Sequence, residues 1–266
     1  MTSRFRSVFR SEKTLIAMAH LLPLPGAPLY DAARGMDGIL ESLRQDLAIL
    51  LDADFDAVMF CNEGDRPYTL QANLAGVAAL ARAVSELAPK TVPFGVDYLW
   101  DAEAALSVAA VTGATFVREV VTGVYESDMG LWRPDAGRLL RRRRELGAEG
   151  TLILMNITPE FASSLGRRTV AEVARSTVVS SLADAILVSG SMAGSEPDMV
   201  TVRAACEGVD GAVPVLVNTG TNAANIGRFL EIADGAIVGS GLKANGDTWA
   251  PVSTERVSSY LRAAGR

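Results

Sequence analysis

The chain has 266 residues, 49% of them apolar, with a formal net charge of -6 and two cysteines. A chain of this length can build one large core. The acidic balance, without a basic tract interleaved with aromatic residues, argues against a nucleic-acid partner. So few cysteines favour a reducing compartment, and no apolar run is long enough to span a membrane. The arginine-containing N-terminus lacks the apolar segment of a secretory signal. We therefore expect a soluble cytoplasmic protein.

Eight short apolar or β-branched segments recur along the chain, and an amphipathic stretch follows almost every one. The predicted strands cover residues 14–21, 55–62, 91–98, 115–121, 151–157, 185–190, 214–220 and 235–240. Helical periodicity lies between them, for example at 38–53, 69–88, 101–113, 138–148 and 222–233. The basic run within 138–148 is interpreted as the solvent side of a helix.

This repeat of strand and helix predicts an α/β fold, a (β/α)8 TIM barrel. We expect a single domain over residues 1–266, with its core at about 12–262. A doubly wound sheet is the main alternative, but no G-x-G-x-x-G motif follows the first strand.

Polar residues gather at the predicted strand ends, where barrel enzymes build their sites. We predict that His20, Asp97 and Glu119 transfer protons, with Asn62, Asp65 and Asn156 in support. Only one of the neighbouring residues Arg118 and Glu119 can point into the barrel. We expect Glu119 to do so, and the alternative for these charges is a structural ion pair.

His20 is the only histidine in the chain and precedes a loop made rigid by three prolines. Besides proton transfer, it could bind a metal: His20, Glu63, Asp97 and Glu119 carry ligand atoms suited to Mg²⁺, Mn²⁺ or Zn²⁺. A histidine that only packs in the core is the third alternative. No other cofactor is expected.

The segments VNTGTNAANI and VGSGLKANG place glycine-containing turns after the last two predicted strands. Such loops bind phosphate through backbone N–H groups in many barrels, although glycine also serves tight turns alone. The predicted phosphate-binding residues are Asn218, Gly220, Thr221, Gly239, Ser240, Gly241 and Lys243. Lys243 could neutralise the phosphate or lie in solvent, and no predicted strand carries the lysine that a Schiff-base aldolase needs.

Several of these segments resemble the BtpA family, and most of all its SgcQ-like branch: AMAHLLPLPGAPLY, VMFCNEGDRPY, ILVSGSMAG and IADGAIVGSGLK. The resemblance spans about residues 12–262 and implies a (β/α)8 barrel. The founding member is described as a factor for photosystem I biogenesis, whereas the SgcQ-like branch is associated with carbohydrate uptake and sugar-phosphate genes. The family motifs match at His20, Pro23, Pro25, Gly26, Asn62, Asp65, Pro67, Tyr68, Glu119, Thr122, Gly123, Ser127 and Asp128.

Two departures from the family pattern limit what can be transferred. Asp97 stands where we expect asparagine, and MNITPEF replaces a run containing a second histidine and a lysine. Our leading hypothesis is an enzyme that acts on a phosphorylated sugar or nucleoside-derived sugar by acid/base chemistry, as an isomerase, epimerase or lyase. The alternatives are a non-catalytic assembly factor of the photosystem I biogenesis type, and a glycosidic-bond hydrolase that uses Glu119 and Asp97. Association into a homo-oligomer is left open.

Overall fold

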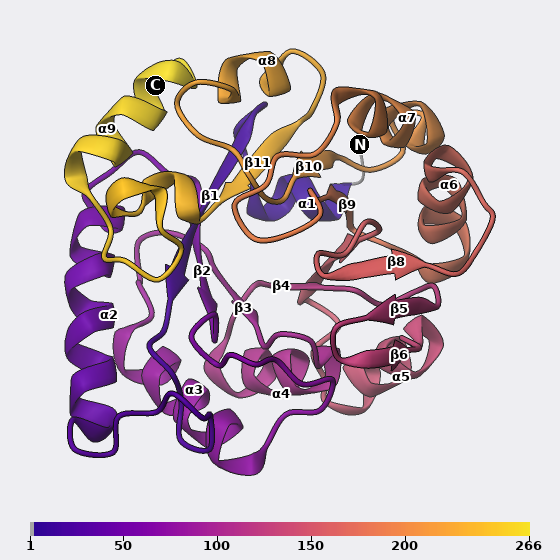
Figure 1. Cartoon of the computed structure of the whole chain (residues 1–266). Coiled ribbons are helices and arrows are strands. Elements are labelled where there is room, and N and C mark those ends of the chain that lie inside the picture. The colour runs from indigo at the N-terminus through magenta and orange to yellow at the C-terminus, as the bar shows by residue number, and fades with distance from the viewer. Residues whose placement is uncertain (1–2) are drawn as a thin grey trace.

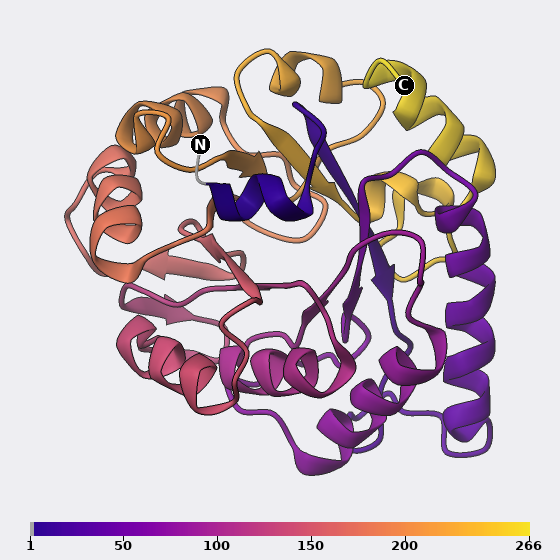
Figure 2. The ribbon, with the colours of Figure 1, turned by 180° about the vertical axis from the view of Figure 1, so that it is seen from behind.

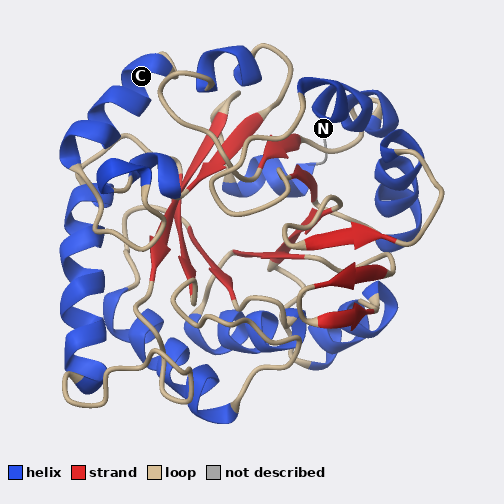
Figure 3. Ribbon diagram, viewed as in Figure 1, coloured by secondary structure: helices blue, strands red, loops and turns tan. Residues whose placement is uncertain are grey.

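The computed structural model describes residues 3–266 and contains a closed barrel of eight parallel strands, as the sequence predicts (Figures 1 and 3). Neighbouring strands in the barrel follow the order β1-β11-β10-β9-β7-β4-β3-β2. The strands are β1 (Thr14–His20), β2 (Ala57–Cys61), β3 (Phe94–Asp97), β4 (Phe116–Glu119), β7 (Leu152–Asn156), β9 (Ala185–Val188), β10 (Val215–Val217) and β11 (Gly235–Val238). Each lies within the range expected from the sequence.

Helices cover the outside of the barrel (Figure 3). They are α2 (Gly35–Leu51), α3 (Leu74–Leu87), α4 (Ala102–Thr112), α5 (Ala136–Glu145), α6 (Val170–Ser181), α7 (Met199–Val209), α8 (Ile226–Leu230) and α9 (Thr254–Ala263), with the short 3-10 helices η1 (Ser240–Leu242) and η2 (Ala244–Gly246) after β11. Asp101, Asp135 and Asp198 accept backbone N–H groups at the starts of α4, α5 and α7, which is why these helices begin there. None of the helices in residues 3–266 has the length and hydropathy that a membrane crossing needs.

The strands alternate between two apolar clusters, one inside the barrel and one between strands and helices. In β4, Phe116 belongs to the inner cluster and Val117 to the outer one. The large Phe116 ring fits inside because Gly95 on the neighbouring strand has no side chain, and a Cβ at Gly95 would lie 2.2 Å from that ring. The alternation decides which polar residues at the strand ends face the barrel axis.

Two features were absent from the prediction. Helix α1 (Ser3–Val8) lies across the N-terminal end of the barrel, as the view from behind shows (Figure 2). Its Phe5 and the following Phe9 are fully buried in the inner cluster, and Phe9 meets Phe116 edge-on at 5.2 Å. This end of the barrel is therefore closed by apolar side chains.

The second feature is a small antiparallel sheet built from two loops at the opposite end. It contains β5 (Tyr125–Ser127), β6 (Gly130–Trp132) and β8 (Ala162–Ser164), in the order β6-β5-β8. The first two strands follow β4 and the third follows β7, so the sheet joins the loops of two neighbouring barrel strands.

Candidate active site

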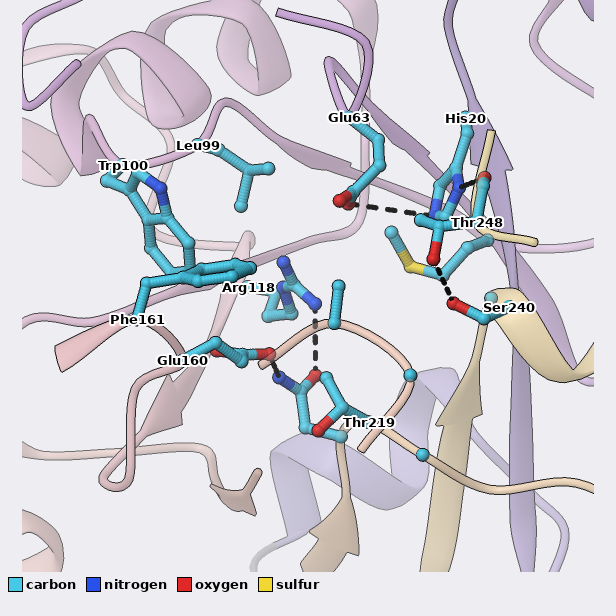
Figure 4. A pocket seen from close by; sticks show the side chains of 16 residues that line it. His20, Glu63, Leu99, Trp100, Arg118, Glu160, Phe161, Thr219, Ser240 and Thr248 are labelled. Atoms are coloured by element: carbon cyan, nitrogen blue, oxygen red, sulfur yellow. Dashed lines mark hydrogen bonds and ion pairs between the residues drawn. The ribbon is translucent and has the colours of Figure 1, made fainter. Parts of the chain in front are cut away.

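A cavity lies over the C-terminal ends of the barrel strands (Figure 4). One part of its wall comes from the first five barrel strands and carries charged and aromatic side chains. The other part comes from the last three and carries small and hydroxyl-bearing residues. The lining residues are Met18, His20, Glu63, Leu99, Trp100, Arg118, Glu160, Phe161, Ala193, Gly194, Asn218, Thr219, Gly220, Gly239, Ser240 and Thr248.

His20 ends β1 on the inner face and lies in the cavity wall, where the sequence predicts it. Its Nδ1 lies 3.2 Å from the carbonyl oxygen of Thr248, and because a carbonyl only accepts, Nδ1 carries the proton. Burial lowers the pKa of His20 to about 3, and the nearby Lys243 ammonium adds to the effect. The ring is therefore neutral at physiological pH, and its Nε2 offers a lone pair.

Glu63 faces this lone pair. Its Oε2 lies 3.9 Å from His20 Nε2, which is too far for a hydrogen bond. Because the His20 ring is neutral, this contact is not an ion pair. The Tyr68 hydroxyl donates to Oε1 at 2.8 Å. Burial raises the pKa of Glu63 to about 7, although the Tyr68 and Arg118 contacts oppose this shift. A carboxyl group with such a pKa can both accept and donate a proton near neutral pH.

Arg118, and not Glu119, lines the cavity, so the expected orientation of this pair was wrong. Arg118 follows the inward Phe116 by two residues and lines the cavity, whereas Glu119, the last residue of β4, does not line it. The Arg118 guanidinium forms a buried ion pair with Asp97 and donates to Asn218 Oδ1 at 3.3 Å. This ion pair is the structural alternative that the sequence left open.

Asp97 and Glu119 are buried carboxyl groups that interact with each other. In the described part of the chain, no other residue hydrogen-bonds to the buried oxygens Asp97 Oδ1 and Glu119 Oε1, and the two side chains hydrogen-bond to each other. Burial and the Asp97 charge raise the pKa of Glu119 well above its usual range, so Glu119 donates to the Asp97 carboxylate. The two carboxyl groups are in direct contact and do not flank an open cleft.

Glu160 is a cavity residue that the sequence analysis missed. It follows β7 by four residues and is buried, with Asn156 donating to its Oε2 at 3.0 Å and Asn218 to its Oε1 at 3.3 Å. Asn156 therefore holds Glu160 and does not line the cavity itself. No strand pattern marks Glu160, because it lies in a loop whose path depends on the rest of the fold.

Asn62 and Asp65 also lie outside the cavity wall and connect neighbouring loops. Asn62 accepts from the backbone N–H of Leu99 at 2.7 Å and donates to Asp65 at 2.9 Å. Asp65 accepts from the N–H of Leu24 at 2.7 Å. These bonds fix the loops after β1, β2 and β3 relative to one another, which is a supporting position.

The predicted phosphate-binding residues divide into two groups. Asn218, Gly220, Gly239 and Ser240 line the cavity, together with Thr219 and Thr248, which were not assigned to phosphate. Thr221 and Gly241 do not line it: the Thr221 hydroxyl lies 3.2 Å from that of Tyr260, and Gly241 packs on the carbonyl of Thr221.

Close packing also explains why glycine occurs at two positions in the cavity wall, Gly220 and Gly239. A Cβ at Gly239 would lie 2.9 Å from the His20 ring, and one at Gly220 would lie 2.1 Å from the N of Glu196. Close packing alone therefore requires glycine at both positions, whether or not they bind a ligand.

Lys243 does not line the cavity, and the expectation that it lies in solvent was wrong. It is 2% exposed, and its Nζ lies 2.6 Å from Asp46 Oδ2 in α2. Asp46 also accepts from the backbone N–H of Val252 at 2.8 Å. The ion pair ties both ends of the loop after β11 to α2.

The four predicted metal ligands do not gather around one point. Asp97 is paired with Arg118, and Glu119 does not line the cavity with His20 and Glu63. Across residues 3–266, no group of three or more His, Cys, Asp or Glu side chains is arranged to hold a metal ion. The set His20, Glu63, Asp97 and Glu119 therefore does not fit as a single metal site.

The BtpA family model matches residues 11–266. The chain belongs to the BtpA family. It is 39% identical to the sgc region protein SgcQ of Escherichia coli (strain K12), covering 97% of both chains. It is 32% identical to the photosystem I biogenesis protein BtpA of Synechocystis sp. (strain ATCC 27184 / PCC 6803 / Kazusa), covering 96% of this chain and 89% of the relative.

Solved structures similar to this BtpA family member are TIM barrels. Phosphoribosyl anthranilate isomerase from Thermotoga maritima matches with a TM-score of 0.58 at 12% identity, covering 95% of this chain and 98% of its own. Thiamine phosphate pyrophosphorylase from Pyrococcus furiosus matches with a TM-score of 0.55 at 14% identity, covering 96% and 97%. Identities this low establish the fold alone.

Proposed function

We propose that this BtpA family member is an enzyme that acts on a phosphorylated sugar or nucleoside-derived sugar by proton transfer, as an isomerase, epimerase or lyase. One observation carries the proposal: Glu63, with a pKa near 7, faces the free lone pair of a neutral His20 within one cavity. A substrate group beside them could exchange a proton with Glu63 while the lone pair of His20 Nε2 accepts a hydrogen bond from the same group. Arg118 lines the same cavity, and its guanidinium could donate a hydrogen bond to a substrate oxygen.

The phosphate would lie against the other part of the cavity wall. Thr219, Ser240 and Thr248 supply hydroxyl groups there, and Gly220 and Gly239 leave the backbone accessible. The loops after the last two strands are where many TIM barrels bind phosphate. The two neighbouring folds are named for a phosphoribosyl and a phosphate compound, which is consistent with this assignment.

The glycosidic-bond hydrolase based on Asp97 and Glu119 does not fit the geometry. Its two carboxyl groups would have to stand about 5 Å or more apart on either side of the scissile bond, whereas these two are hydrogen-bonded to each other. The assembly-factor alternative leaves the buried Glu63, Arg118 and Glu160 around a cavity without a purpose, although burying such groups is costly.

The test is a thermal-shift screen followed by proton exchange. D-ribose 5-phosphate and D-glucose 6-phosphate should raise the melting temperature, whereas free D-ribose and D-glucose should not. A compound that binds should then exchange a carbon-bound proton in D₂O, visible by NMR, and Glu63→Gln should reduce this exchange by about 100-fold or more.

Glu207→Gln is the matched control, because Glu207 is exposed on α7, away from the cavity. It should bind and exchange like the wild type. If no phosphorylated sugar stabilises the protein, the proposal is wrong.

A further inference from the structure

In the charged part of the cavity, two carboxyl groups, those of Glu63 and Glu160, lie near a single arginine, Arg118. Figure 4 shows Glu63 and Glu160 on either side of Arg118. We infer that the reacting end of the substrate is an uncharged, hydroxyl-bearing group, and that the site rejects compounds with a second anionic group at that end. This inference rests on the proposed function and narrows its substrate class to sugar monophosphates with a neutral reacting end.

The first step is that Arg118 is already neutralised. Its guanidinium is buried and forms an ion pair with Asp97. Burial and the Asp97 charge raise the pKa of Glu119 well above its usual range, so Asp97, which is in contact with Arg118, carries the negative charge of this carboxyl pair. Arg118 and this pair therefore sum to no net charge, and the arginine does not make the cavity attractive to an anion.

The second step is that Glu160 is a carboxylate. Burial raises the pKa of Glu160 and the Arg118 charge opposes this shift, but both carboxyl oxygens accept hydrogen bonds from amide groups, one from Asn156 and one from Asn218, as the ionised form does. Arg118 is the only cationic side chain that lines the cavity within residues 3–266. This part of the cavity therefore carries a net negative charge, to which ionised Glu63 would add.

The third step concerns what such a surface binds. Carboxylates and the Asn218 amide hydrogen-bond well to sugar hydroxyls, which are neutral donors and acceptors. Leu99, Trp100 and Phe161 form an apolar wall beside Glu160, suited to the C–H face of a sugar. A carboxylate or second phosphate at this end would instead meet like charges in a buried setting, where screening is weak.

The experiment is isothermal titration with three probes: D-ribose 5-phosphate, D-ribulose 1,5-bisphosphate and 6-phospho-D-gluconate. The wild type should bind the monophosphate at least about tenfold more tightly than either probe with a second anion. Glu160→Gln removes one negative charge and should bring the affinity for 6-phospho-D-gluconate closer to that for D-ribose 5-phosphate. Glu207→Gln should keep the wild-type ratio.

The outcomes separate this inference from the proposed function. If the wild type binds 6-phospho-D-gluconate or the bisphosphate as tightly as the monophosphate, the inference is wrong and the phosphorylated-sugar proposal stands. If none of the probes binds to protein with an intact melting transition, both are wrong. The ratio of the affinities for the monophosphate and the doubly anionic probes is measured on the wild type, so the test holds even if Glu160→Gln folds poorly.

Discussion

At the scale of single residues, burial determines the chemistry of the site. His20 and Glu63 are ordinary residue types, but burial lowers the pKa of the first to about 3 and raises that of the second to about 7. The sequence places both residues at strand ends but contains no sign of these shifts, because they depend on what surrounds the side chains after folding. Glu63 was accordingly predicted as a metal ligand and not as an acid or base.

The raised pKa of Glu63 predicts a change in how stability depends on pH. Between its usual value of 4.5 and about 7, the folded protein holds a proton that the unfolded chain releases. Stability therefore falls as pH rises through this window, and His20, with its lowered pKa, has the opposite effect between about 3 and 6.5. Glu63→Gln removes only the Glu63 contribution, so its free energy of unfolding relative to wild type should rise by about 3 kcal/mol between pH 4 and pH 8.

Urea unfolding of both proteins at several pH values measures this difference. Glu207→Gln should follow the wild-type curve at every pH. A constant offset between Glu63→Gln and wild type across the range would show that Glu63 has an unshifted pKa.

At the scale of elements, the sequence predicts the barrel strands well and the loops poorly. The barrel strands are apolar runs flanked by helical periodicity, whereas β5, β6 and β8 have three residues each and no helix immediately precedes them. Three residues are too few for alternation to be recognised. Strand β4 is ambiguous for another reason: Arg118 and Glu119 are both buried, one on each face, so no burial rule chooses between them.

The loop after β11 allows a test of what Lys243 does. Lys243→Met would leave Asp46 as an unpaired buried charge, and we expect a loss of about 3 to 5 kcal/mol in the free energy of unfolding. Lys13→Met is the matched control, since Lys13 is more exposed and lies far from this pair. Unfolding in guanidinium measures both. Unchanged stability together with lost binding of D-ribose 5-phosphate would instead favour the phosphate role expected from the sequence.

At the scale of the whole molecule, the two ends of the barrel are unlike each other. Helix α1 closes the N-terminal end with Phe5 and Phe9, and the cavity occupies the C-terminal end. The sequence predicts that the site lies at the C-terminal end, since the site of a TIM barrel follows from the fold. The sequence does not predict that α1 closes the N-terminal end, because this packing depends on the contact of Phe9 with Phe116, more than a hundred residues further along the chain.

This closure should contribute strongly to global stability. Phe9→Ala removes a fully buried ring from the inner cluster, and we expect a loss of about 3 to 5 kcal/mol. Leu131→Ala truncates an exposed apolar side chain and should change stability by less than about 0.5 kcal/mol. Thermal unfolding compares the two variants. An equal effect of both would mean that α1 does not pack against the barrel in solution.

The lone histidine has a practical consequence. Because the chain contains one imidazole, the ring protons of His20 give NMR signals that need no assignment. The ring forms part of the cavity wall and is fixed to the Thr248 carbonyl. The protein thus carries its own reporter at the candidate site, and a compound library could be screened by watching a single side chain, before any substrate has been identified.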